Sequence, residues 1–169
     1  MFDIFVKVVY GNKKEFGTGH LIRCLNIINY LDKRNRLKKI GLLIYSSENK
    51  SETTRIIKFY NKKIKIFFSK KKNSIKELES FNSELLIIDS LSKLKNLDIK
   101  KLKEYHKKII LFDDTNFKSD NYNLKINSLL WKKKFNNNKN LSGFEYNIIP
   151  SFFKKLKKIN KKKKIFIFF

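Results

Sequence analysis

The sequence has few of the residues that mark disulfide-rich, zinc-binding or secreted proteins. Cys24 is its single cysteine, so no disulfide can form within the chain, and zinc frameworks built on several cysteines are excluded. No basic leader with a small-residue cleavage site precedes the first apolar run. No apolar run approaches the roughly 18 residues that a membrane helix requires. We therefore expect a cytoplasmic protein without a membrane span.

Alanine and glutamine are absent and arginine is scarce, although the formal net charge is +25. Lysine supplies nearly all of the positive charge. Because arginine makes most bidentate contacts to bases and phosphates, its scarcity argues against nucleic-acid binding as the main function. The surplus of Asn, Ile, Lys and Phe instead indicates an AT-rich genome. A basic nucleic-acid-binding module remains an alternative, because clustered lysines do bind phosphate backbones.

The pattern of apolar runs indicates an α/β fold. The chain has 169 residues, of which 41% are hydrophobic, enough for one packed domain. Amphipathic or capped segments predict helices after Gly17 and at residues 51–60, 74–81 and 94–106. Apolar runs predict strands at residues 2–10, 40–45, 64–68, 84–89 and 108–113. Strands that are apolar on both faces and alternate with helices are typical of a doubly wound, Rossmann-like parallel sheet.

A glycine-bracketed loop, Gly17-Thr18-Gly19-His20, joins the first predicted strand to the helix that follows. The two glycines allow a sharp turn, and the N–H groups of the first helical turn suit a phosphate or a developing oxyanion. His20 adds a group that can transfer a proton near neutral pH. A Gly-x-Gly pair also occurs in turns that bind nothing, so the loop by itself leaves both interpretations open.

Polar pairs follow two further predicted strands, and these are Asp89 with Ser90 and Asp113 with Asp114. Ligands of doubly wound sheets bind beyond the carboxyl ends of the strands, where the strand order reverses. We therefore expect these acids to contact ligand groups or to orient His20, although acids at such positions also cap helices. Arg23 lies one turn after His20 on the same helix face, where it approaches an anionic ligand or pairs with one of the acids.

The string Gly17-Thr18-Gly19-His20-x-x-Arg23-Cys24-Leu25 resembles the amino-terminal domain of the UDP-sugar hydrolase of pseudaminic-acid synthesis and the related spore-coat polysaccharide proteins. The similarity continues through residues 85–90 and 109–114. That family has the two-domain glycosyltransferase-B architecture and is similar to the lipid-linked N-acetylglucosamine transferases of cell-wall synthesis. Those transferases usually carry proline three residues after the histidine, where this chain has Arg23, and this difference favours the hydrolase branch.

The resemblance implies that water removes UDP from a UDP-linked diacetamido-trideoxy sugar, without a cofactor or metal. His20 would be the catalytic residue, and the glycine loop would let the sugar or diphosphate approach closely. With the polar residues at the strand ends included, the substrate-binding candidates are Gly17, Thr18, Gly19, Arg23, Asp89, Ser90, Asp113 and Asp114. A glycosyltransferase of similar architecture that uses a UDP-sugar donor is the alternative enzyme.

The resemblance also predicts how the chain is divided. Residues 1–153 would form the Rossmann-like amino-terminal domain, residues 154–164 a lysine-rich linker, and residues 165–169 the first strand of a carboxyl-terminal domain that holds the nucleotide. We expect such a half to be inactive alone and to need a separate carboxyl-terminal half as partner. His106 ends a lysine-rich predicted helix and is expected on the surface.

Overall fold

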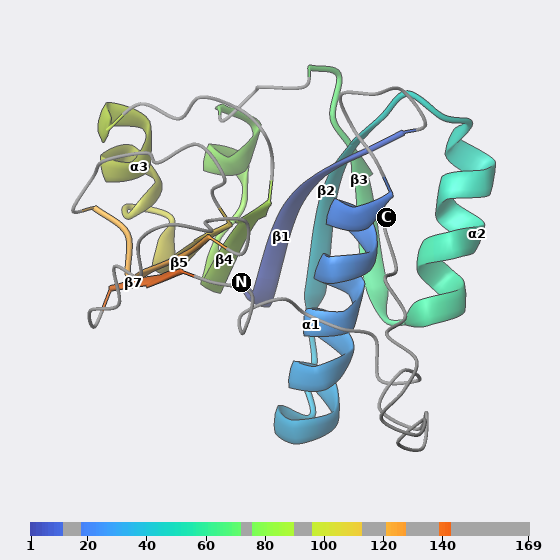
Figure 1. The fold of residues 1–169 in the computed structure, drawn as a ribbon, viewed down its shortest axis with the longest axis horizontal. Helices are drawn as coiled ribbons and strands as arrows, with labels where there is room; N and C mark the ends of the chain where they lie inside the picture. The colour runs from blue at the N-terminus through green and yellow to red at the C-terminus, as the bar shows by residue number, and fades with distance from the viewer. Residues whose placement is uncertain (12–17, 72–75, 90–95, 113–120, 128–138, 143–169) are drawn as a thin grey trace, which may run out of the picture.

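The computed structural model describes residues 1–11, 18–71, 76–89, 96–112, 121–127 and 139–142. Strands and helices alternate along most of these ranges (Figure 1). The strands are β1 (Phe2–Tyr10), β2 (Ile40–Ser46), β3 (Ile64–Phe68), β4 (Ser83–Asp89), β5 (His106–Phe112), β6 (Leu124–Asn127) and β7 (Asn140–Ser142). The helices are α1 (Gly19–Asn35), α2 (Lys50–Tyr60), α3 (Asn96–Leu102) and the short 3-10 helix η1 (Lys76–Ser80).

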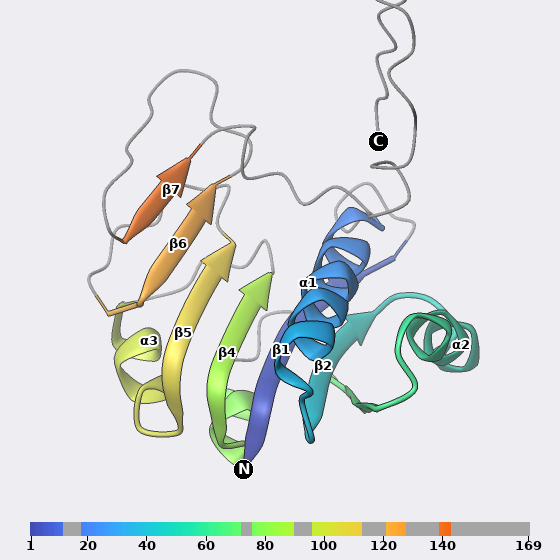
Figure 2. The same ribbon diagram turned by 90° about the horizontal axis from the view of Figure 1, so that it is seen from below.

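The strands form one parallel sheet in the order β3-β2-β1-β4-β5-β6-β7. Figure 2 shows the part from β2 to β7 from below. The chain runs outward from β1 to β3 on one side, returns to β4 beside β1, and then runs outward again to β7. The strand order therefore reverses between β1 and β4, where Val8 is the register partner of Asp89. This is the doubly wound, Rossmann-like α/β fold that the sequence predicted, and the predicted strands correspond to β1 through β5.

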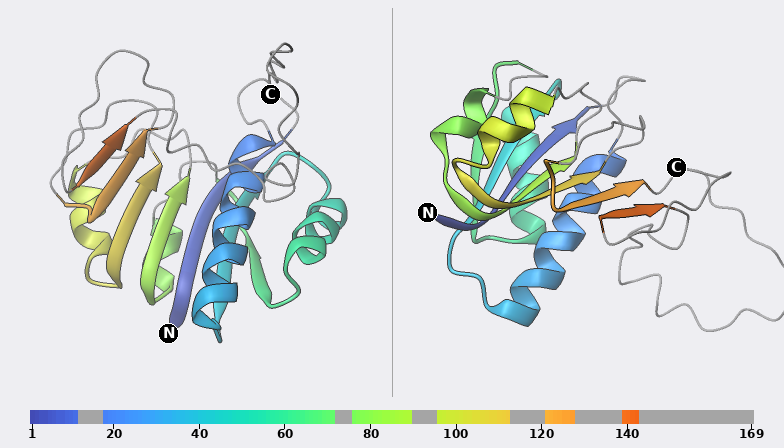
Figure 3. Two further views of the ribbon diagram at one scale, coloured as in Figure 1. Left: turned by 60° about the horizontal axis from the view of Figure 1, so that its bottom comes forward. Right: turned by 90° about the vertical axis from the view of Figure 1, so that its left-hand side faces the viewer.

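Helices cover both faces of the sheet. In the right-hand view of Figure 3, α1 lies on one side of the strands and α3 on the other. Alternate residues of β1 supply both cores: Val6 and Val8 pack with Leu25 of α1, whereas Phe5 packs on the opposite face with Ile99 of α3. Burial on both faces explains why the strands read as nearly continuous apolar runs.

An aromatic cluster fills the face beneath α3 and η1. Phe5 stacks on Phe81 with the ring centroids 4.4 Å apart, and Phe67 lies 4.7 Å from Phe81. Gly41 on β2 makes room for this cluster, because a Cβ at that position would overlap the Phe5 ring. Close packing of this kind leaves no space for an added methyl group.

The expectation that His106 is a surface residue was wrong. α3 ends at Leu102, the next three residues form turns, and His106 begins β5 with only 1% of its surface exposed. Its Nδ1 lies 2.8 Å from Ser83 Oγ and its Nε2 lies 3.2 Å from the Leu78 carbonyl oxygen. Since a carbonyl only accepts, Nε2 carries the proton and Nδ1 accepts from the serine hydroxyl.

The described residues include only part of one further predicted segment and none of another. The segment predicted as a helix at residues 74–81 contains η1, a 3-10 helix. The predicted linker and final strand at residues 154–169 lie outside the described residues. None of the helices in the described part of the chain has the length and apolar character needed to cross a membrane.

Candidate functional site

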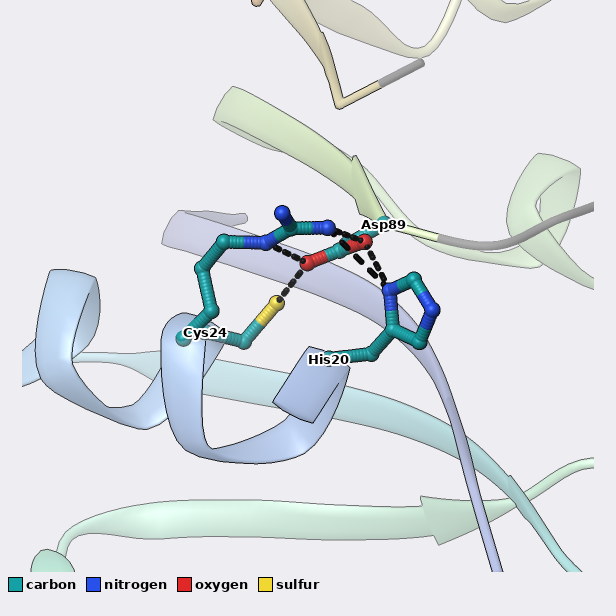
Figure 4. Close-up of polar contacts among 4 residues, drawn as sticks. His20, Cys24 and Asp89 are labelled. Carbon is teal, nitrogen blue, oxygen red and sulfur yellow. Dashed lines mark hydrogen bonds and ion pairs between the residues drawn. The ribbon is translucent and has the colours of Figure 1, made fainter. Parts of the chain in front are cut away.

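A histidine and an aspartate meet where the strand order reverses. His20 lies in the first turn of α1, and Asp89 is the last residue of β4. His20 Nδ1 is 2.6 Å from Asp89 Oδ1, as the dashed lines in Figure 4 show. The His20 side chain is 16% exposed, whereas that of Asp89 is 1% exposed. The imidazole therefore reaches solvent, while its partner is buried beneath it.

Arg23 binds the same carboxylate with two nitrogens. Its Nε donates to Asp89 Oδ2 at 2.7 Å, and its Nη2 donates to Oδ1 at 2.6 Å. Paired N–H groups of a guanidinium match the two oxygens of a carboxylate in one plane, which makes such contacts strong and directional. Of the two roles open to Arg23 from the sequence, the structure bears out the pairing with an acid.

Asp89 is held as a carboxylate. Burial by itself would raise its pKa, but hydrogen bonds from His20 and Arg23, together with the charge of Arg23, outweigh burial and lower the pKa. A carboxylate accepts hydrogen bonds and cannot donate them. The arrangement therefore places one permanent negative charge under the histidine ring.

The ionised carboxylate determines which nitrogen of His20 carries the proton. Nδ1–H must donate to Asp89, so in the neutral ring Nε2 has the free electron pair. Arg23 Nη2 is also 3.1 Å from His20 Nδ1, but both groups are donors, and their closeness follows from sharing Asp89 Oδ1. Figure 4 shows the second ring nitrogen on the side remote from Asp89. His20 thus presents a proton acceptor away from the core.

Cys24 is a further neighbour of the carboxylate. Its Sγ is 3.5 Å from Asp89 Oδ2, and the residue is completely buried. Burial and the nearby charge of Asp89 raise the pKa of the thiol well above its usual value. A buried, protonated thiol is a weak donor and a poor nucleophile, so Cys24 supports Asp89 and does not itself attack a substrate.

The amino-terminal end of α1 is open. Thr18 and Gly19 are exposed, and the Thr18 side chain makes no capping hydrogen bond. A Cβ added to Gly19 would meet no atom of the described residues within 4 Å, and Gly19 is already helical. Packing and backbone shape therefore do not require glycine at position 19, contrary to the role in a sharp turn that the sequence indicated. Thr18 and Gly19 are thus exposed residues at the start of the helix that carries His20.

The structure brings together His20, Arg23 and Asp89 of the predicted site, with Thr18 and Gly19 exposed at the start of the same helix. The remaining candidates, which are Gly17, Ser90, Asp113 and Asp114, lie outside the described residues. The sequence did not single out Phe112, the last residue of β5. Its ring lies 4.7 Å from Arg23 Cζ, and its only sequence signal is a position at the end of a strand.

The described residues form no metal-binding cluster at His20 and Asp89, and a hollow that described residues line is elsewhere. Across the described ranges, no three His, Cys, Asp or Glu side chains gather in a way that would hold a metal ion. An open hollow of about 450 Å³ lies at the opposite, amino-terminal end of the sheet, lined in part by Asp3, Arg36 and Glu84. The chemistry and this hollow are therefore at different ends of the strands.

No known protein family, curated protein or solved structure matches this chain.

Proposed function

We propose that the chain acts on a nucleotide sugar and that it removes UDP from a UDP-linked diacetamido-trideoxy sugar with water. The observation that carries this proposal is the contact between His20 Nδ1 and the ionised, buried Asp89 at the reversal of the strand order. Ligands of doubly wound sheets bind at this place. The choice of substrate rests on the resemblance of the string from Gly17 to Leu25 to nucleotide-sugar hydrolases.

In the proposed reaction His20 is the general base. Nε2 takes a proton from water while the water oxygen bonds to the sugar carbon. The bond from that carbon to the phosphate oxygen breaks, and UDP leaves with its electron pair. Asp89 holds the ring in orientation and stabilises the imidazolium that forms, as the acid does in serine-hydrolase triads. A base of this kind contributes roughly 100- to 10,000-fold to a rate.

The open start of α1 supports an anionic substrate at the same place. Helix amino termini attract negative charge, because the first-turn N–H groups point outward without partners in the helix. With no Cβ at Gly19 and no side-chain cap from Thr18, a diphosphate or sugar hydroxyl has access to these groups. The charged group and the base would then lie within one helical turn of each other.

Product analysis tests the proposal. The chain is incubated with the UDP-sugar, alone and with a separately produced nucleotide-binding domain of glycosyltransferase-B type, each with and without an acceptor sugar. Hydrolysis predicts free sugar and UDP in equal amounts, unaffected by the acceptor. A sugar–acceptor product would overturn hydrolysis in favour of a transferase. Absence of UDP release in every arm would contradict both enzymes.

A further inference from the structure

We propose that Phe112 is a positioning residue: through Arg23, its ring fixes the Asp89 carboxylate and thereby keeps the proton of neutral His20 on Nδ1. The effect on a reaction rests on the proposed function, whereas the effect on the histidine proton does not. The Phe112 ring meets the Arg23 guanidinium, and that guanidinium binds Asp89, so we infer that the influence passes through the guanidinium.

The sheet register places Phe112 beside Asp89. The two are register partners at the ends of β5 and β4, so their side chains emerge on the same face of the sheet. That face is the one covered by α1, since Phe112 belongs to the core that includes Leu21 and Leu25. Arg23 reaches from α1 across both strand ends.

Arg23 is restrained in two different ways. Its Nε and Nη2 edge is bound to Asp89, and its Cζ lies over the Phe112 ring, 4.7 Å from the ring centroid. A guanidinium is attracted to an aromatic face, and the attraction grows where water is excluded. Phe112 is 6% exposed and the Arg23 side chain 14%, so this contact is largely dry.

These restraints matter because the terminal torsion of an aspartate is soft. Rotation about the bond to its carboxylate spans a broad range, so a single hydrogen bond from His20 would not fix the plane of the oxygens. Two donors from a clamped guanidinium do fix it. Oδ1 is then aimed at His20 Nδ1, and the ring cannot exchange its tautomer without losing that bond.

The two histidines of the chain provide a built-in comparison. His20 carries its proton on Nδ1 because Asp89 accepts there, whereas His106 carries it on Nε2 because the Leu78 carbonyl accepts there. Nitrogen-15 NMR separates the two forms of a neutral imidazole. One spectrum therefore reports the tautomer of the candidate base and that of a buried histidine on the other face of the fold.

The test records these spectra at alkaline pH for the native chain and for Phe112→Leu, Phe112→Tyr and Arg23→Lys. We expect Phe112→Leu and Arg23→Lys to change His20 from the Nδ1–H form to a mixture of both tautomers. Phe112→Tyr keeps an aromatic face and should retain the Nδ1–H form. Phe81→Leu is the matched control, because Phe81 belongs to the aromatic cluster on the opposite face. Unchanged His106 signals establish that each variant is folded.

An unchanged His20 tautomer in folded Phe112→Leu would overturn the proposal, and so would an equal change in Phe81→Leu. If Phe112→Leu does not fold, Phe112→Met replaces it, because methionine removes the ring at similar side-chain volume. UDP release separates this inference from the proposed function. If Phe112→Leu changes the His20 tautomer but the native chain releases no UDP, the positioning role stands and the proposed function fails. If the native chain releases UDP but Phe112→Leu leaves the His20 tautomer unchanged, the positioning role fails and the proposed function stands. Where both hold, Phe112→Leu should lower the rate on the order of 100-fold.

Discussion

His20 and Asp89 are 69 residues apart in the sequence, and their side chains meet at 2.6 Å. The contact follows from the topology: α1 starts just after β1, and β4 returns to pair with β1. The carboxyl ends of β1 and β4 therefore lie side by side where the two halves of the sheet diverge. The same contact gives His20 one proton position and leaves Nε2 for chemistry.

Asp89→Asn should strongly destabilise the fold, although the side chain keeps its shape. Arg23 would lose its charge partner while remaining largely buried, and breaking a buried pair in this way costs about 3–5 kcal/mol. Urea unfolding measures the loss. Glu84→Gln is the control, because the Glu84–Lys107 pair is exposed and such pairs contribute about 1 kcal/mol or less. Equal losses in the two variants would contradict a buried charge network.

Gly19→Ala should leave stability unchanged or raise it by up to about 1 kcal/mol, because alanine favours helix and its Cβ meets no atom there. Binding of the UDP-sugar and UDP release should nevertheless fall, since the methyl group occupies the open helix start. Gly41→Ala is the structural counterpart and should cost about 1–3 kcal/mol by displacing the Phe5 ring. Full activity in Gly19→Ala would show that no ligand approaches this helix end.

His106 should make stability dependent on pH. Burial lowers the pKa of His106 in the folded state, while its hydrogen bond to Leu78 opposes that shift. The stabilisation is complete above the unfolded pKa of about 6.5 and is lost as the pH falls toward the folded pKa, because the unfolded chain then binds the proton more readily. Urea unfolding of the native chain and of His106→Asn measures it. The stability difference between them should shrink from pH 7.5 to pH 5.5, and parallel pH profiles would refute the assignment.

Cys24 should be unreactive in the folded chain. Burial and the Asp89 charge raise the pKa of its thiol, so iodoacetamide should label it in urea and hardly at all in buffer. Cys24→Ser keeps a donor toward Asp89 and should retain the UDP-release rate of the native chain. Rapid labelling of the native protein would contradict the buried position of the thiol.

Much of the fold could be predicted from local pattern. Apolar runs bounded by polar segments located β1 through β5, because strands buried on both faces need apolar residues at nearly every position. The rule that ligands bind at the carboxyl ends of parallel strands placed His20 near Asp89, Asp113 and Asp114 alike, and the structure identifies Asp89 as a partner of His20. β6 and β7 are short, and no clear apolar run marks either of them in the sequence.

What the sequence could not supply was the register between strands. The runs that end in Asp89 and Asp113 look alike, yet the residue paired with Asp89 is Phe112. His106 misled for a similar reason, because its lysine-rich surroundings are typical of a surface helix. Its burial depends on Ser83 and Leu78, which are more than twenty residues away in the sequence. Both the pairing of Asp89 with Phe112 and the burial of His106 depend on contacts between segments that are distant in the sequence.

The most direct test of the account compares UDP release by the native chain and by His20→Gln in one assay with the UDP-linked diacetamido-trideoxy sugar, with and without the added nucleotide-binding domain. Glutamine retains a polar side chain of similar reach but cannot act as a base. The account predicts that the native chain releases UDP when the nucleotide-binding domain is added, and that the variant does so at least about 100-fold more slowly. Equal rates, or no release by the native chain in either arm, would contradict it.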